Sequence, residues 1–296
     1  MKIYEKWREL NIDPKDINFK KIKLIKQISF PHCGNDVIEC ECEINNTSII
    51  NAFIKIERST RASFETEVNH LKILIDNNYY KKIPKVIEDG NIEDKKYIVL
   101  EKINGSRLSD IFLEINDQEL KNNYLVKYGK ELATIHNIPG KLFLEAKQRS
   151  INNYPSKEKY KKFDATISKY IDYLIENKPE INYNTFIHGD FHYGNILWEN
   201  ENISGVLDWE YSGKGFKEQD IAWACILRST QRFMDNISDI KYFLKGYNSI
   251  GSFDKEKLKW CLINGYCHFY IMNKEEKIYR KKIRNLLLEI NKWNFL

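Results

Sequence analysis

One stretch of the sequence, residues 186–209, constrains this chain more than any other part. It reads F-I-H-G-D-F-H-Y-G-N-I-L-W-E-N-E-N-I-S-G-V-L-D-W, and its main polar positions are Asp190, Asn195 and Asp208. Short apolar segments lie before Asp190, after Asn195 and before Asp208, which predicts short buried strands around a polar loop. The mostly polar turn at 199–205 predicts a hairpin that brings Asn195 and Asp208 close together.

These residues have the spacing of a phosphoryl-transfer site. His188, Asp190 and Asn195 fit the pattern H-x-D-x-x-x-x-N, in which the Asp orients or deprotonates an attacking hydroxyl and the Asn binds a metal ion. Asp208 would supply a second oxygen ligand to Mg²⁺. A chance set of carboxylates in a polar loop is the alternative, but the complete spacing and the apolar flanks argue against it. We therefore predict Asp190 as the catalytic residue, with Asn195 and Asp208 as metal ligands.

The same stretch resembles the aminoglycoside phosphotransferases and their relatives, the choline kinases and other small-molecule kinases with a protein-kinase-like fold. The family pattern is close to H-G-D-x-x-x-x-N-x-L, followed by an apolar pair and D-W or D-F, and residues 188–197 and 206–209 match it. Gly189 stands where protein kinases have Arg, and no A-P-E element follows Asp208. Both departures argue against a protein kinase.

The resemblance implies an α+β, bilobal protein-kinase-like fold. A small N-terminal lobe, residues 1–102, would consist of an antiparallel sheet with one main helix and would bind the nucleotide. A larger and mainly helical C-terminal lobe, residues 103–296, would carry catalysis and substrate binding. ATP would lie between the two lobes.

Two further polar residues of the second lobe match the family. Asp220 opens an Asp-apolar-Ala element, and the resemblance implies that this Asp braces the catalytic loop and begins a helix as its N-cap. His136 closes the amphipathic helix expected at 123–137. We expect His136 to be packed rather than catalytic.

The resemblance assigns the phosphate contacts to Lys55 and a partner carboxylate. Lys55 lies in the strand-like run 49–57, and in kinases such a Lys contacts the α- and β-phosphates and pairs with a helix Glu. Glu65 and Glu67 both lie early in the helix expected at 63–77. Glu67 fits the family pattern E-x-x-x-L-x-x-L better. A solvated Lys on a half-exposed strand is the alternative for Lys55.

A loop before Lys55 is a second candidate for phosphate binding. Residues 31–36 join two strand-like runs and contain Gly34 and Asn35. Backbone N–H groups approach a phosphate best where small residues allow it, and the family uses this loop in that way. Taken alone, the segment favours a plain hairpin turn, and its position ahead of Lys55 makes the two interpretations equal.

The base of the nucleotide is expected at the end of the strand-like run 96–103. The resemblance implies that backbone groups of Glu101 and Ile103 hydrogen-bond the adenine edge, with Leu100 behind the base. A medium-sized aliphatic residue at that position favours ATP, and GTP stays open. An ordinary strand that ends in a turn is the alternative.

The acceptor is less constrained than the reaction. We expect a small molecule with a hydroxyl group, first of all an aminoglycoside-type antibiotic, whose positive charges call for an acidic pocket. The acidic run that follows the Asp-apolar-Ala element in one aminoglycoside branch is missing here, since residues 225–236 contain a single acidic residue. The candidate acceptor ligands are Glu210, Tyr211, Glu218 and Asp235, with Asp239 as a further acidic residue.

Two other readings remain open. A choline-type or other small-metabolite kinase would bind a quaternary ammonium group in an aromatic cage. The residues that could form it, most of them expected in the core, are Trp209, Tyr211, Trp223, Trp260, Tyr266, Phe269 and Tyr270. A nucleotide-binding module without turnover is the second reading, and the joint presence of Lys55, Asp190, Asn195 and Asp208 argues against it.

Composition excludes several classes of protein. A net charge of +5 with dispersed basic residues is weak evidence for nucleic-acid binding. The sequence has no apolar run long enough to span a membrane and no secretory signal at its start. Its 6 cysteines form no C-x-x-C pair, which indicates reduced thiols. We expect a cytoplasmic monomer whose partners are a nucleotide and a small acceptor.

Overall fold

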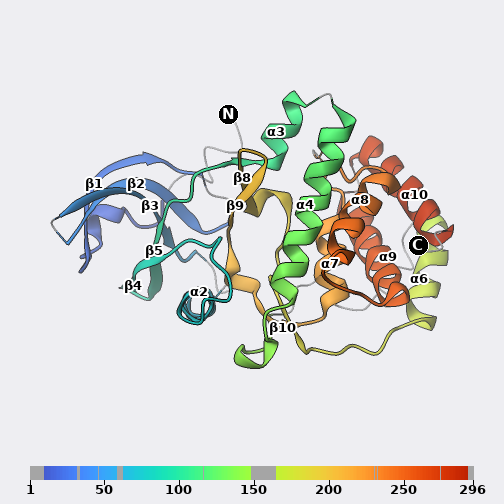
Figure 1. Ribbon diagram of the computed structural model, residues 1–296, viewed down its shortest axis with the longest axis horizontal. Coiled ribbons are helices and arrows are strands. Elements are labelled where there is room, and N and C mark those ends of the chain that lie inside the picture. Colours follow the sequence, from blue (N-terminus) through green and yellow to red (C-terminus); the bar gives the residue numbers. More distant parts are fainter. Residues whose placement is uncertain are drawn as a thin grey trace. The chain divides into compact units, whose positions relative to one another are not determined.

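A computed structural model describes residues 10–31, 34–45, 47–58, 63–115, 117–147, 165–229, 231, 233–273 and 275–292 (Figure 1). Contacts divide the chain into two compact units. The first is Met1–Asn104 with Ser204–Tyr211, and the second is Gly105–Ile203 with Ser212–Leu296. The expected boundary at residue 102 leaves 204–211 in the second domain, whereas the contacts group this segment with the first unit. The assignment of nucleotide binding to one domain and catalysis to the other stays a prediction.

The first unit is built on an antiparallel sheet with the strand order β1-β2-β3-β5-β4. Its strands are β1 (Ile22–Ser29), β2 (Asp36–Ile44), β3 (Ser48–Ile56), β4 (Val86–Ile92) and β5 (Lys95–Glu101). Side chains alternate between the two faces of a strand. The buried side chains of Ile38, Cys40 and Cys42 in β2 therefore share one face, which packs in the core of this unit.

Helix α2 (Phe64–Asp76) is the main helix of the first unit. The Ser63 hydroxyl caps it by accepting a hydrogen bond from the Thr66 N–H at 3.2 Å, which satisfies one of the free donors of the first turn. Val68, Leu71 and Leu74 recur at helical spacing and are buried. Glu67 lies one residue before Val68 and is also buried, so a carboxylate enters the interior of this unit.

The second unit is mainly helical, and the α+β fold class is therefore as predicted. Its helices are α3 (Leu108–Glu114), α4 (Gln118–His136), α6 (Ala165–Glu176), α7 (Lys217–Cys225), α8 (Ile237–Asn248), α9 (Lys255–Met272) and α10 (Lys277–Lys292). Short strands lie around the loop that carries Asp190: β6 (Ser106–Arg107), β7 (Thr185–Ile187), β8 (Ile196–Glu199), β10 (Gly213–Gly215) and β9 (Asn202–Val206), whose end belongs to the first unit. They form the sheets β10-β7 and β6-β8-β9.

Three local expectations need correction. Helix α4 begins at Gln118 rather than residue 123, because the Asp117 carboxylate caps it through the N–H groups of Glu119 and Leu120. The turn expected at 199–205 is shorter, since β9 already begins at Asn202. Asp220 is not a helix N-cap. Helix α7 begins at Lys217, so Asp220 lies within it.

Glycines allow α4 and α8 to pack closely, and Figure 1 shows the two helices side by side. A Cβ atom at Gly129 of α4 would overlap the carbonyl oxygen of Phe243, and one at Gly246 of α8 would overlap that of Val126. The two glycines therefore let each helix backbone approach the other. This packing anchors α4, whose last residue, His136, is buried.

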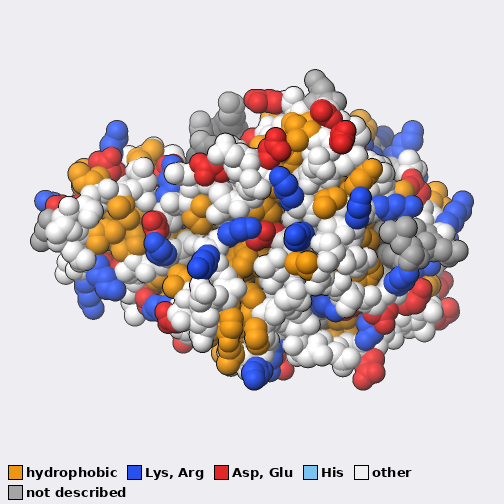
Figure 2. All heavy atoms as spheres, viewed as in Figure 1, with side chains coloured by type: hydrophobic (Ala, Val, Ile, Leu, Met, Phe, Trp, Pro, Cys, Tyr) orange, Lys and Arg blue, Asp and Glu red, His pale blue; other side chains and the backbone are white. Residues whose placement is uncertain are grey.

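Charge and cysteine content agree with an ordinary folded domain. On the face drawn in Figure 2, Lys and Arg side chains are interspersed with Asp and Glu. The cysteines that the structure describes are buried free thiols, Cys40, Cys42, Cys225, Cys261 and Cys267, while Cys33 lies outside the described residues. Among the described helices, none combines the length and the apolar character that crossing a membrane requires.

We predict that Gly129→Ala lowers the free energy of unfolding by about 1–3 kcal/mol, although Ala favours a helix over Gly by about 1 kcal/mol. The added methyl group forces α4 away from α8. Gly246→Ala should act in the same way, and the double variant should cost less than the sum because the helices separate only once. Urea denaturation measures these differences. Lys130→Ala, at an exposed position of α4, is the control, and equal effects of Gly129→Ala and Lys130→Ala would contradict the packing argument.

Candidate functional site

A buried lysine and two carboxylates form the centre of the candidate site in the first unit. Strand β3 carries Lys55, whose Nζ lies 2.7 Å from Glu67 Oε2 and 2.9 Å from Asp208 Oδ1. Glu67, and not Glu65, is thus the helix carboxylate that contacts Lys55. Glu65 instead forms an exposed ion pair with Lys96 at 2.7 Å. The sequence pattern had favoured Glu67 for this pairing.

The charges of this cluster depend on one another. Burial alone would lower the pKa of Lys55, but the carboxylates of Asp208, Glu67 and Glu210 outweigh it and raise that pKa, so the ammonium stays charged. Burial raises the pKa of Glu67, and Lys55 opposes this rise. An isolated charge would be costly to bury, and the contacts compensate for that cost. Lys55 is therefore a buried positive charge whose position these carboxylates fix.

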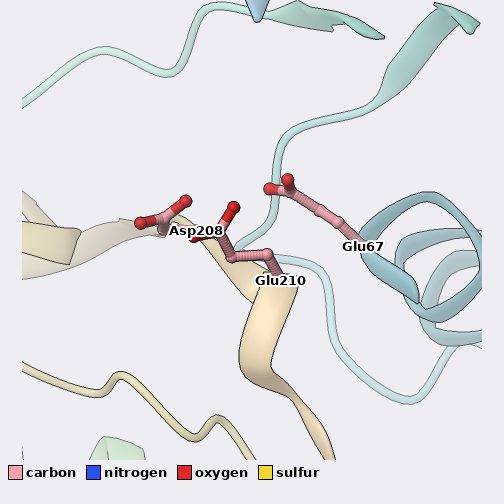
Figure 3. Close-up of side chains that lie close together, drawn as sticks. All are labelled: Glu67, Asp208 and Glu210. Carbon is pink, nitrogen blue, oxygen red and sulfur yellow. The ribbon is translucent and has the colours of Figure 1, made fainter. Parts of the chain in front are cut away.

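Three carboxylates converge beside Lys55. Figure 3 shows Glu67 reaching from α2 toward Asp208 and Glu210, and one ligand oxygen from each lies within 4.8 Å of the others. The Glu67 side chain is fully buried, whereas 34% of the Asp208 side chain is exposed. Carboxylate oxygens are the donors that Mg²⁺ prefers. The set fits a divalent cation, and Asp208 is its accessible member.

The backbone at Asp208 is unusual. Its φ angle is +69°, in the left-handed region that residues other than Gly, Asn and Asp rarely adopt. The next residue is anchored, since Trp209 donates its indole N–H to the Val206 carbonyl at 2.9 Å and its ring meets that of Tyr80. Such conformations persist where the surroundings hold them, and they are frequent at functional sites.

Asn35 joins the loop before β2 to this cluster. Its side-chain amide donates to Glu210 Oε2 at 3.1 Å, and its Oδ1 accepts the Arg58 N–H at 3.2 Å. Gly34 beside it has a φ angle of +111° and open space where a side chain would be. The loop thus combines a small residue, Gly34, with a neighbour, Asn35, whose side chain is held by hydrogen bonds. His32 and Cys33 lie outside the described residues. The contact with Glu210 had no signal in the sequence, because the two residues are far apart along the chain.

The residues expected to meet the base lie at the end of β5. Leu100 is buried and pairs with Phe53 across the sheet. The Glu101 N–H donates to the Lys85 carbonyl at 2.9 Å, so this donor is engaged within the first unit. Ile103 follows the strand, and its side chain fills the space beside Gly205.

The loop that carries Asp190 belongs to the second unit and is held by its own polar groups. His188 Nδ1 accepts the Asp190 N–H at 3.1 Å, and the Asn195 amide donates to the Asp190 carbonyl at 3.1 Å. Asp220 Oδ2 accepts the His188 N–H at 2.9 Å, and Asp220 Oδ1 accepts the Gly189 N–H at 3.1 Å. The loop bracing expected of Asp220 is therefore present, although Asp220 does not cap a helix.

A second layer of hydrogen bonds fixes Asp220. His136 Nε2 lies 3.1 Å from Asp220 Oδ2, and His136 Nδ1 lies 2.8 Å from the Tyr247 hydroxyl. All three side chains are buried. His136 therefore positions Asp220 and is packed, as expected.

One contact of Asp190 was not foreseen. The Trp223 indole N–H donates to Asp190 Oδ1 at 2.8 Å, whereas the sequence had placed Trp223 only among candidate cage residues. Asp220 and Trp223 are three positions apart in α7, so they lie on the same face of that helix. The sequence shows this three-residue spacing. It predicts a contact between Trp223 and the loop only once α7 is known to pack against that loop.

The acceptor candidates have separate surroundings. Glu210 and Tyr211 belong to the first unit, while Glu218 and Asp235 belong to the second. Glu218 is buried and accepts the Asp254 N–H at 2.9 Å. Asp235 pairs with Lys282 at 3.0 Å. Each of these two acidic residues thus has a local structural partner.

The aromatic candidates are mostly engaged within the protein. The guanidinium carbon of Arg228 lies 4.6 Å from the ring centre of Trp223 and 5.6 Å from that of Phe269. Arg280 lies 4.0 Å from the ring centre of Tyr270. Three of the rings are held by hydrogen bonds to backbone carbonyls, namely Trp209 to Val206, Trp260 to Leu174 and Tyr266 to Cys225.

Solved structures share this fold at low sequence identity. A thermostable mutant of aminoglycoside phosphotransferase APH(4)-Ia, in a ternary complex with AMP-PNP and hygromycin B, has a TM-score of 0.60 at 14% identity over 93% of this chain and 96% of its own. Choline kinase LicA from Streptococcus pneumoniae has a TM-score of 0.56 at 14% identity, over 92% of this chain and 95% of its own. A putative fructosamine-3-kinase from Haemophilus somnus has a TM-score of 0.50 at 18% identity, over 92% of this chain and 90% of its own. These similarities support the protein-kinase-like fold.

A search of curated protein sequences gave no significant match. A sequence model described as the phosphotransferase enzyme family does match, over residues 47–261. That range contains Lys55, Asp190, Asn195 and Asp208, and it covers most of the chain. This chain therefore belongs to the phosphotransferase enzyme family.

Proposed function

We propose that the chain transfers the γ-phosphoryl group of ATP to a hydroxyl group of a small molecule, with Asp190 as the catalytic base. The observation that carries this proposal is the Asp190 carboxylate itself, which is mostly buried and held at Oδ1 by an indole N–H at 2.8 Å. Phosphoryl transfer needs such a group to accept or orient the proton of the attacking hydroxyl. Membership of the phosphotransferase family supports the same reaction.

The proposed reaction is an in-line displacement. The acceptor oxygen forms a bond with the γ-phosphorus as the bond from that phosphorus to the bridging oxygen of ADP breaks. The proton of the acceptor hydroxyl passes to the Asp190 carboxylate, and ADP leaves with the electron pair of the broken bond. Positioning and charge stabilisation supply most of the rate enhancement in such reactions.

Lys55, Asp208 and Asn195 would bind the phosphates and their metal ion. Lys55 has a fixed charge, and its pKa is raised by the neighbouring carboxylates, so it suits the α- and β-phosphates. Asp208 offers an accessible carboxylate, and we assign Asn195 as the second ligand. Mg²⁺ bound by these residues would neutralise phosphate charge. Glu67 would hold Lys55 in place.

The first unit would also bind the rest of the nucleotide. We assign the loop at Gly34 and Asn35 to the phosphates, because the open space at Gly34 allows the backbone to approach an anion. We assign Leu100, the Glu101 carbonyl and Ile103 to the base. ATP is the proposed donor, and GTP is the alternative to compare with it.

Aminoglycoside-type antibiotics are the first acceptor class that we propose. The shared fold with an enzyme solved in complex with hygromycin B supports it. The local partners of Glu218 and Asp235 weaken it, because carboxylates that serve a structural role are less available to a polycation. Choline is the alternative, and Arg228 argues against a quaternary ammonium group between Trp223 and Phe269, since a guanidinium already occupies that aromatic pair.

An ATP-turnover assay with Mg²⁺ tests the proposed function. Purified protein is assayed against a panel of aminoglycosides and, separately, against choline and related amino alcohols, with ATP and GTP as donors. Turnover that depends on one acceptor identifies the class. Binding of ATP without turnover on either panel would argue for a different acceptor or for a nucleotide-binding module without catalysis.

We predict that Asp190→Asn lowers kcat by at least a hundredfold while nucleotide affinity changes less than threefold. The amide keeps the shape and the acceptor atom for Trp223 but cannot take a proton. Steady-state kinetics and calorimetric titration with ATP measure the two quantities. Asp110→Asn, at an exposed position of α3, is the control for loss of one carboxylate, and unchanged turnover in Asp190→Asn would remove Asp190 from the proposed role.

We predict that Asp208→Asn weakens Mg²⁺-ATP binding by about tenfold or more, because a neutral amide is a poorer metal ligand than a carboxylate. Asn is chosen because it tolerates the left-handed φ angle of +69° at this position, which Ala does not. Calorimetric titrations with ATP, in the presence and absence of Mg²⁺, measure the effect. Asp94→Asn, in an exposed turn of the first unit, is the matched control. An unaltered Mg²⁺ dependence in Asp208→Asn would contradict the assignment.

A further inference from the structure

Helix α7 contacts the catalytic loop at two points. Asp220 binds the loop backbone through the N–H groups of His188 and Gly189. One turn further along the same helix, Trp223 reaches the Asp190 side chain, and its indole Nε1 lies 2.8 Å from Asp190 Oδ1. The first contact sets the path of the loop, and the second sets the orientation of the carboxylate.

The Trp223 side chain is itself held in place. The guanidinium of Arg228 stacks on the Trp223 ring with 4.6 Å between its central carbon and the ring centre. Arg228 Nη1 donates to the Trp223 carbonyl at 2.9 Å and to the Ile226 carbonyl at 2.6 Å, which satisfies carbonyls at the end of α7 and places a positive charge where the helix dipole favours it. Phe269 of α9 also lies beside the ring, with 5.9 Å between ring centres.

We propose that Trp223 is a positioning residue for Asp190, and that Arg228 holds Trp223 in the orientation this requires. The inference rests on the proposed function, in which Asp190 is the base. With Oδ1 bound to the indole, Oδ2 is the oxygen that takes the proton of the acceptor hydroxyl. A fixed carboxylate loses less freedom when the reaction begins than a rotating one.

Trp223 is the nearer of two side chains that approach the same oxygen of Asp190. Its indole N–H is a donor only and lies 2.8 Å from Oδ1, whereas His192 Nε2 lies 3.7 Å from Oδ1. Arg228 and Tyr128 are further ionisable groups whose charges interact with Asp190. We therefore assign the orientation of Oδ1 to the indole of Trp223.

Trp223→Phe tests the inference, because it removes the N–H and retains a ring for Arg228. We expect kcat to fall by about ten- to hundredfold, because the variant loses one hydrogen bond to a charged group. The KM for ATP should change less than threefold. The matched control is Trp260→Phe, which removes an indole N–H that donates to the Leu174 carbonyl at 2.9 Å. It should leave kcat unchanged.

A measurement without turnover tests the contact directly. In protein with ¹⁵N-labelled indole nitrogens, the NMR signal that is absent from Trp223→Phe belongs to Trp223. This signal should shift when Asp190→Asn replaces the charged acceptor with a neutral one, while the Trp260 signal stays in place. An unchanged position of the Trp223 signal in Asp190→Asn would overturn the proposed contact.

The outcomes separate the inference from the proposed function. Full turnover by Asp190→Asn would defeat the proposed function, because Asp190 would not be the base. Loss of turnover in Asp190→Asn, with wild-type kcat in Trp223→Phe, would leave the function intact and overturn the inference. Equal losses in Trp223→Phe and Trp260→Phe would also overturn it, since the effect would then be a general one on stability.

Discussion

The hydrogen bonds of the buried Asp220 carboxylate are the interaction that joins the loop of Asp190 to the helices of the second unit. It accepts two backbone N–H groups from the loop that carries Asp190 and contacts His136, which in turn contacts Tyr247. A buried carboxylate is costly unless its oxygens are satisfied, and here they bind groups from the loop, from α4 and through His136 from α8. The fold of the helices and the conformation of the loop are therefore linked by one side chain.

A similar constraint acts in the first unit, where the buried charge is positive. Lys55 lies on β3 and meets carboxylates from α2 and from the segment that carries Asp208. The pairing ties the helix, the sheet and this segment together. The same contacts that make the charge tolerable in the interior also set its position, which is what the proposed contact with phosphates would require.

The surroundings of the aromatic residues bear on the identity of the acceptor. Several rings that could have formed a cage for a quaternary ammonium group hold arginine side chains of the same chain, Arg228 on Trp223 and Phe269, and Arg280 on Tyr270. Cation–π contacts of this kind stabilise the fold, and they engage rings that a cationic ligand would otherwise contact. The contacts therefore argue against a cage built from Trp223, Phe269 and Tyr270.

The sequence by itself determined the parts of this protein that depend on local spacing. The candidate positions Asp190, Asn195 and Asp208 follow from the spacing of one short pattern. The resemblance of that pattern to a family implied the α+β class and singled out Lys55 and Glu67. Tertiary structure alone decided which distant side chains meet. The contacts of Trp223 with Asp190, of Asn35 with Glu210 and of Arg228 with Trp223 and Phe269 depend on how whole elements pack, which no local pattern specifies. The place of Asp220 within α7 was missed for a related reason, since an Asp can begin a helix or serve a buried network, and only packing against the loop selects between them.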